Sequence, residues 1–210
     1  MSKIESKSGL AIALAGLEGF GSPKVNQEQY LMDSEIGATV LWHAYNLGDI
    51  KERVITDLGC GTGILGIGAL LLDCKSSFFV DSDKHALGIA KNNISKVKSE
   101  GYRIRKVKFI CEDIKNIEFT ADVVIQNPPF GTKIRHMDVV FLGKALEIAP
   151  IVYSFHKSES KGYLERYSAK KNVEITHIWD FKFPLKAVFG FHRRQIHRIN
   201  VSCFRFQRQI

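Results

Sequence analysis

The chain has 210 residues, of which 45% are hydrophobic and 25% are charged, as expected of a globular protein of one domain. It contains no run of about 18 apolar residues and no secretory signal pattern, so we expect neither a membrane span nor secretion. The four cysteines lack the spacing of a zinc site, which argues against structural zinc and favours a reducing, cytoplasmic compartment.

The net charge of +8 is concentrated at the C-terminal end. From position 182 onward the chain has seven lysine and arginine residues and no Asp or Glu, which leaves +1 for the first 181 residues. Because phosphate contacts supply most non-specific affinity for nucleic acids, this asymmetry suggests a polyanionic partner. A solvated basic face is the alternative that charge alone leaves open. The seven residues are Lys182, Lys186, Arg193, Arg194, Arg198, Arg205 and Arg208.

Apolar residues at helical spacing mark the start of the chain. Leu10, Leu14 and Leu17, and a second set over 36–41, predict helices packed before a sheet. Beyond position 50, strand-like and helical runs alternate, which predicts an α/β fold with a mostly parallel sheet. Strands are expected over 53–58, 77–81, 107–111, 121–126 and 151–155, and helices over 64–72, 86–97 and 138–149.

The pattern changes after position 155. A polar helix is expected over 158–171, followed by long strand-like runs over 173–183 and 196–206. The connection between these runs is too short for a crossover helix, so they should form an antiparallel hairpin at the sheet edge. We therefore expect a Rossmann-like, mostly parallel seven-stranded sheet in one domain over 1–210. An N-terminal helical cap would span 1–50 and a catalytic core 51–210.

A glycine-rich segment, Asp57-Leu58-Gly59-Cys60-Gly61-Thr62-Gly63, follows the first strand. Ligands bind at the carboxyl ends of strands in such sheets, and glycines let the backbone approach them closely. The helix that starts after the loop adds unpaired N–H groups.

Two ligands match this loop. Gly61, Gly63 and Gly66, with Asp81 twenty residues after Gly61, match the fingerprint for nicotinamide dinucleotides. The extra Gly59, and the position of Asp57 two residues before it, instead suit an acid that contacts the amino group of a bound amino acid. In this the loop resembles the first motif of class I S-adenosylmethionine methyltransferases. A tight turn without a ligand is the third interpretation.

Three residues at the ends of the next strands support a nucleoside cofactor. Asp81 ends the second strand, where its carboxylate can accept both hydroxyls of a ribose. Asp113 follows the third strand and can accept the adenine amine, with Ile114 against the ring. A lone Asp in such a place is otherwise a turn or cap residue.

The tetrapeptide Asn127-Pro128-Pro129-Phe130 follows the fourth strand. Consecutive prolines fix the backbone and remove two N–H donors, so the turn presents acceptors only. With the Asn127 amide oxygen, two acceptors can converge on one NH2 group, which is what methylation of a planar amine requires. Phe130 offers a face on which an extruded adenine can stack. The alternative is an ordinary β-turn.

The sequence resembles the methyltransferase-like protein five family of archaea and eukaryotes, which methylate N6 of adenine in small-subunit ribosomal RNA. The resemblance implies cofactor contacts by Thr62 and Ile64 and closure over the methionine end by Gln29 and position 32. Here Met32 replaces the usual threonine and cannot donate its hydrogen bond. Eukaryotic members also have a small zinc-containing partner. The similar segments are 17–20, 23–24, 28–30, 57–63, 127–133, 141–142, 145–146, 152–154, 156–157 and 191–192.

We therefore expect an S-adenosylmethionine-dependent enzyme that methylates the N6 amine of adenosine in structured, small-subunit ribosomal RNA. Methylation of a protein glutamine or of DNA adenine through the same tetrapeptide is one alternative, and an RNA-binding assembly factor without turnover is another. The residues expected to contact RNA mix cations with aromatic neighbours. They are Lys133, His156, Lys157, His192, Arg193 and Arg194.

Overall fold

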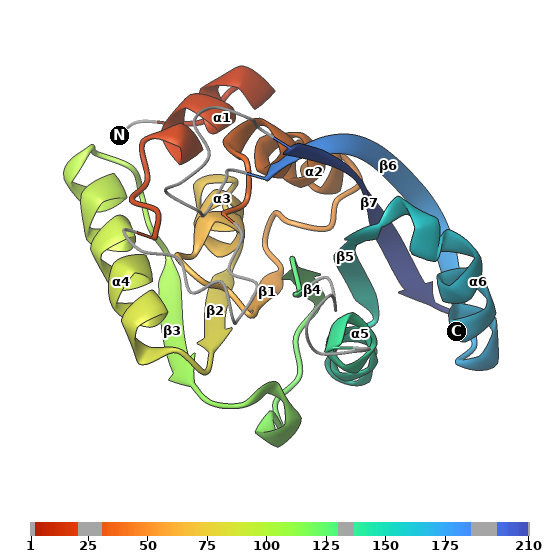
Figure 1. Cartoon of the computed structure of the whole chain (residues 1–210). Helices are drawn as coiled ribbons and strands as arrows, with labels where there is room; N and C mark the ends of the chain where they lie inside the picture. Colours follow the sequence, from red (N-terminus) through yellow and green to blue (C-terminus); the bar gives the residue numbers. More distant parts are fainter. Residues whose placement is uncertain (1–2, 21–30, 130–136, 186–196, 210) are drawn as a thin grey trace, which may run out of the picture.

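The computed structural model describes residues 3–20, 31–129, 137–185 and 197–209. A seven-stranded sheet forms its centre, with strand order β3-β2-β1-β4-β5-β7-β6 (Figure 1). The first five strands run parallel, whereas β7 is antiparallel to both β5 and β6. The expected fold, including its edge hairpin, is confirmed. The strands are β1 (Val54–Leu58), β2 (Ser76–Asp81), β3 (Lys106–Cys111), β4 (Val123–Gln126), β5 (Ile151–Lys157), β6 (Val173–Leu185) and β7 (His197–Arg208).

Helices cover both faces of this sheet, because alternate residues of its central strands are apolar on each side. In β4, Val123 and Ile125 belong to one buried apolar cluster and Val124 to the other. The first cluster includes residues of α1 (Lys7–Ala15), α2 (Ser34–Asn46), α3 (Ile64–Leu71) and α4 (Lys84–Ser99). The second includes residues of the 3-10 turn η2 (Ile114–Asn116), α5 (Met137–Ile148) and α6 (Lys161–Lys170), which follows the turn η3 (Ser158–Ser160).

Local capping explains where several helices begin. The Ser6 hydroxyl accepts the N–H of Gly9 ahead of α1, and the Asp33 carboxylate accepts two N–H groups at the start of α2. The helix predicted over 138–149 corresponds to α5, and Asp138 lies in its first turn. The Asp138 carboxylate lies 3.3 Å from Nδ1 of His156. In the described part of the chain, no helix is long and apolar enough to cross a membrane.

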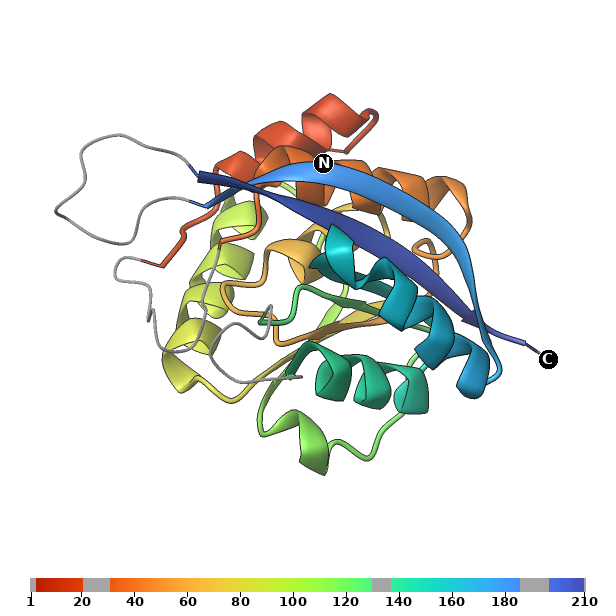
Figure 2. The same ribbon diagram turned by 45° about the vertical axis from the view of Figure 1, so that its right-hand side comes forward.

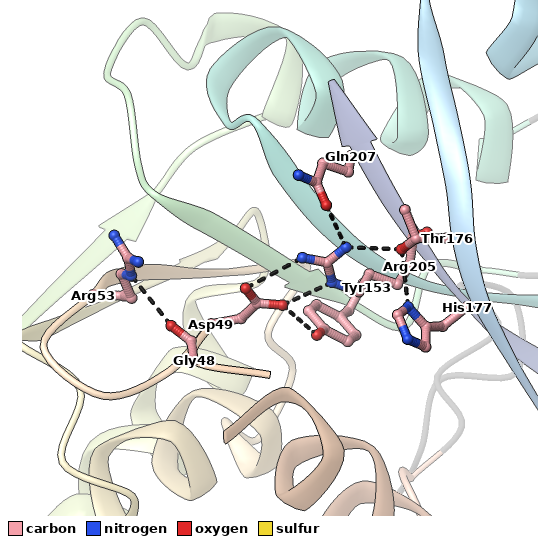
Figure 3. A network of polar contacts seen from close by, with 8 residues as sticks. All are labelled: Gly48, Asp49, Arg53, Tyr153, Thr176, His177, Arg205 and Gln207. Atoms are coloured by element: carbon pink, nitrogen blue, oxygen red, sulfur yellow. Dashed lines mark hydrogen bonds and ion pairs between the residues drawn. The ribbon is translucent and has the colours of Figure 1, made fainter. Parts of the chain in front are cut away.

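The strands β6 and β7 form a long curved ribbon at one edge of the sheet (Figure 2). The outer strand β6 contacts both α2 and α6. A buried polar network holds the ribbon from inside (Figure 3). Arg205 of β7 donates to Asp49, which follows α2, and the Tyr153 hydroxyl of β5 donates to the same carboxylate. The edge hairpin is thereby bound to the parallel sheet and to the N-terminal helices.

Candidate active site

The glycine loop leaves β1 in a conformation that few residues other than glycine adopt. Gly59 and Gly63 have φ angles of 70° and 86°. A Cβ on Gly59 would lie 2.7 Å from Cε1 of Phe141, and one on Gly63 would lie 3.0 Å from both Ala90 and Phe79. The N–H groups of Gly59 and Cys60 both donate to the carbonyl of Val80 in β2. The loop is therefore packed tightly at the carboxyl ends of β1 and β2.

A hollow with about 360 Å³ of open space lies against this loop. Its wall contains six residues that the sequence predicted for the site, including Asn127 from the end of β4. Asn127, the first residue of the tetrapeptide predicted to be catalytic, and the glycine loop thus lie in one wall, although they are far apart in the chain. The predicted residues in the wall are Asp57, Gly59, Gly61, Thr62, Ile64 and Asn127, and the other wall residues are Phe20, Leu31, Met32, Cys60 and Leu65.

Asp57 is a fully buried carboxylic acid in the wall of this hollow. Burial raises its pKa to about 7, although the backbone N–H of Gly66, which donates to Oδ2 over 2.7 Å, lowers it, and the charge of Asp81 raises it further. Such a group gains most from a cationic partner, because opposite charge offsets the cost of desolvation. A ligand ammonium group is a partner of this kind.

The other acidic residues predicted for the cofactor lie outside the wall of the hollow. Asp81 uses both carboxylate oxygens, accepting N–H groups of Gly61 and Asp83 over 2.8 Å each. It thereby fixes the loop, and each oxygen keeps a second lone pair. Asp113 is exposed and caps η2 by accepting the N–H of Lys115, and Ile114 beside it is buried. Their contacts with a cofactor stay predictions.

Asn127 has an amide oxygen that is buried but has no hydrogen-bond partner among the described residues. Buried polar atoms without partners are rare in native proteins, because each costs about 1–3 kcal/mol. An acceptor in the wall of a hollow that has no partner among the described residues can receive a donor from a ligand. Pro128 next to it is buried, whereas Phe130 lies outside the described residues.

Several residues at this site were not predicted from the sequence to form it, and position 32 was expected there only through the resemblance. Phe20 and Leu31 line the hollow, and so does Met32, whose role the resemblance had left in doubt. Asn93 of α4 is buried below them, with its amide oxygen accepting Glu18 N–H and its amide nitrogen donating to the carbonyls of Glu18 and Thr62. It joins the segment 17–20 to the glycine loop. Only packing of the N-terminal segment reveals these positions.

The residues predicted to contact RNA are distributed differently. His156 is fully buried, so the expectation that its ring belongs to an RNA-binding surface is wrong. Lys157 is partly exposed and lies 3.7 Å from Glu159. Of the C-terminal cations, Arg205 is buried against Asp49 and does not contribute charge to the surface. Predicted site residues outside the described part of the chain are Gln29, Phe130, Lys133, His192, Arg193 and Arg194.

The chain is similar to known proteins over nearly its whole length. A profile of the family described as methyltransferase small domain matches residues 33–146. An uncharacterised protein of Methanocaldococcus jannaschii is 36% identical, with 96% of this chain and 94% of the relative covered. The rRNA N(6)-adenosine-methyltransferase METTL5 of Danio rerio is 32% identical, with 94% of this chain and 96% of the relative covered.

A solved structure leads to the same family. The crystal structure of a protein from Pyrococcus horikoshii, described as a candidate RNA methyltransferase, superimposes with a TM-score of 0.89. The two chains are 39% identical, and the match covers 99% of this chain and all of the other. Together with the profile, which spans more than half of the sequence, these similarities show that the chain belongs to the methyltransferase small-domain family.

Proposed function

We propose that this methyltransferase transfers a methyl group from S-adenosylmethionine to the N6 amine of an adenosine in structured RNA of the small ribosomal subunit. The observation that carries the proposal is the buried amide oxygen of Asn127, which has no hydrogen-bond partner among the described residues and lies in the same hollow as the glycine loop. The names of the full-length relatives, which include METTL5 proteins of three animals, support the RNA substrate.

The chain's own groups would prepare the amine. The lone pair of an adenine N6 amine is delocalised into the ring, so the amine is a poor nucleophile. The two N–H groups of the amine would donate hydrogen bonds to Asn127 Oδ1 and to the carbonyl of Pro128. These bonds would favour a pyramidal nitrogen and aim its lone pair at the methyl group. S-adenosylmethionine supplies an electrophilic methyl group when bound. The amine loses its proton after transfer, so no general base is needed. Phe130 would stack on the extruded base.

The cofactor would be held by the predicted residues around the glycine loop. Asp57 would pair with the ammonium group of the methionine moiety, and Asp81 would accept the ribose hydroxyls. Asp113 would accept a hydrogen bond from the adenine amine of the cofactor, and Ile114 would pack against the adenine ring. Met32 would contact the cofactor through its thioether, without a hydrogen bond. The remaining predicted contacts are those of Gln29, Gly59, Gly61, Thr62, Gly63 and Ile64.

RNA would bind through the basic side chains predicted for this role, namely Lys133, Lys157, His192, Arg193 and Arg194. We also infer that the chain works as one catalytic domain, since α1 and α2 share the buried cluster of the sheet. The cytoplasm is the compartment we propose for it. A small zinc-containing activator stays a prediction from the resemblance, and co-purification with zinc analysis tests it.

Transfer of labelled methyl groups to deproteinised small-subunit RNA tests the proposal. We expect wild-type protein to label adenosine N6 there, and to label neither protein nor duplex DNA. Asn127→Ala should abolish labelling while cofactor and RNA binding persist, whereas Asn92→Ala, at an exposed position on α4, should leave the rate unchanged. Labelling of protein or DNA alone would favour the alternative substrates. Cofactor and RNA binding without turnover in the wild type would favour an assembly factor.

A further inference from the structure

Four buried or partly buried side chains link the end of β4 to the start of α5, and the connection between these two elements is called the catalytic loop below. Gln126, the last residue of β4, directly precedes Asn127, and its amide nitrogen donates to the Ser154 hydroxyl over 2.9 Å. The Ser154 oxygen lies 2.7 Å from Nε2 of His156, and Nδ1 of His156 lies 3.3 Å from Oδ2 of Asp138. Asp138 is in the first turn of α5, where the chain returns from the loop.

The hydrogen bonds among these four side chains can all run in one direction, from Gln126 to Asp138. Because Ser154 accepts from Gln126, its hydroxyl hydrogen is available to Nε2 of His156. The Nδ1–H of the ring can then donate to Asp138, whose carboxylate, when ionised, can accept but not donate hydrogen bonds. Burial raises the pKa of Asp138, but the hydrogen bond from His156 and the backbone N–H groups of Val139 and Asp138 lower it, and its pKa is below the ordinary value.

The four linked side chains lie on the α5 face of the sheet, outside the wall of the hollow. Gln126, Ser154 and His156 are fully buried, and the ring of His156 meets Phe204 edge-on with centroids 6.0 Å apart. Gln126 and Ser154 are register partners in β4 and β5. None of these side chains is in the wall of the hollow. They therefore act on Asn127 through the backbone and not by touching a substrate.

Stability alone does not account for a polar chain in this place. The surrounding cluster is apolar, and replacing buried polar groups with apolar ones of the same shape is often neutral or stabilising. The chain also leaves the Gln126 amide oxygen buried without a partner among the described residues, which costs stability. Hydrogen bonds do, however, fix distance and direction more closely than apolar packing.

We propose that Ser154 and His156 are positioning residues that hold the two ends of the catalytic loop at a fixed separation and so place the Asn127 amide. This inference rests on the proposed function for its kinetic consequence only. A misplacement of 1 Å in a reacting group can reduce a rate by about a hundredfold, so a link outside the pocket can control turnover.

Removal of each link tests this role. We expect Ser154→Ala and His156→Ala to reduce the single-turnover rate of methyl transfer by about tenfold to a hundredfold. The dissociation constants for S-adenosylmethionine and RNA should change by less than about threefold, because no contact to either is lost. Tyr153→Phe is the matched control, since it removes a buried hydroxyl from the adjacent residue of β5 on the opposite face. Its rate should equal that of the wild type.

Conservative variants separate positioning from folding. Asp138→Asn keeps an acceptor for His156 and should retain the rate within about threefold, whereas Asp138→Ala should not. His156→Asn and His156→Gln each keep one of the two links and should recover part of the loss in His156→Ala. If His156→Ala fails to fold, the two Asp138 variants and Ser154→Ala decide the question. Equal rates in Ser154→Ala and Tyr153→Phe would overturn the proposal.

Hydrogen exchange of a peptide that covers 127–137 gives a readout independent of the substrate. We expect at least about fivefold faster exchange in Ser154→Ala and His156→Ala than in the wild type, and no change in Tyr153→Phe. Wild-type protein that fails to methylate RNA would contradict the proposed function, but exchange would still decide the present inference. Unchanged exchange in both variants would contradict the inference itself.

Discussion

Arg205 and Asp49 form a buried ion pair across 156 positions of sequence, with Nε of Arg205 donating to Oδ2 of Asp49 over 2.7 Å. The same carboxylate accepts the Tyr153 hydroxyl over 2.6 Å, and Nη1 of Arg205 donates to Thr176 and Gln207 (Figure 3). Burial and the bond to Asp49 raise the pKa of Tyr153, so it stays a donor. The network therefore ties three strands to the end of α2.

Removing one partner of this pair should destabilise the protein strongly. We expect Arg205→Met or Asp49→Ala to lower the free energy of unfolding by about 3–5 kcal/mol, because each leaves a buried charge without its partner. The double variant should lose less than the sum of the two, since it leaves neither charge unpaired. Urea unfolding of the four proteins measures the coupling. Additive losses would show that the two side chains do not stabilise each other.

Burial of Arg205 also sets an expectation for RNA binding. The exposed Arg198 lies on the same strand, so Arg198→Gln should reduce the slope of log affinity against log salt by about one phosphate contact. Arg205→Met, measured at a temperature at which it is folded, should leave the slope unchanged. A reduced slope in Arg205→Met and not in Arg198→Gln would place the RNA surface elsewhere.

The order and type of the elements were predictable, because the signals are local. The apolar runs that form β1 and α3 can each be recognised from a few consecutive residues. The burial of His156 and Arg205 was not predictable, since a polar side chain suggests exposure unless its partner is known. Their partners, Asp138 and Asp49, lie 18 and 156 positions away.

The same distinction applies to the site. Glycine spacing and the proline pair gave the loop and Asn127, because these residues restrict the backbone directly. The apolar wall formed by Phe20, Leu31 and Met32 depends on how the N-terminal segment packs against the sheet, for which a sequence pattern gives no direct signal. Side chains that line a hollow and side chains that fill a core have the same apolar character.

Asp57 should make stability depend on pH in an unusual direction. Its folded pKa, about 7, is above the ordinary 3.8, so the native state binds more protons than the unfolded state between these values. The free energy of unfolding is therefore highest below pH 3.8. It falls as pH rises through 7, by about 4 kcal/mol in all.

The variant Asp57→Asn isolates this effect, because its amide oxygen can still accept the N–H of Gly66. We expect Asp57→Asn to be more stable than the wild type at pH 8 by about 2–4 kcal/mol, with a smaller difference at pH 5. Its affinity for S-adenosylmethionine should fall by about tenfold or more, since the cationic ammonium loses its partner. Urea unfolding and calorimetry measure the two quantities. A variant that is less stable at pH 8 would show that the desolvated charge is not what matters.

Two glycines provide a matched test of the loop geometry. Gly63→Ala places a Cβ 3.0 Å from Phe79 and Ala90 at a positive φ, so we expect a loss of about 1–3 kcal/mol and weaker cofactor binding. Gly88→Ala, inside α4 with nothing within 4 Å of the new Cβ, should instead gain up to about 1 kcal/mol and bind normally. Thermal unfolding and calorimetry compare them. Equal behaviour of the two variants would mean that the loop tolerates a side chain at position 63.

Asn93 is buried and its neighbour Asn92 is exposed on the same helix, so the two residues offer a matched comparison for the wall of the hollow. Asn93→Ala leaves the N–H of Glu18 and the carbonyls of Glu18 and Thr62 without their partner, so we expect a loss of about 2–3 kcal/mol in unfolding free energy. The segment that carries Phe20 should then separate from the glycine loop and weaken cofactor affinity at least about fivefold. Asn92→Ala, exposed on the same helix, should change neither quantity. If Asn93→Ala loses stability but binds the cofactor normally, the segment 17–20 does not form part of the binding site.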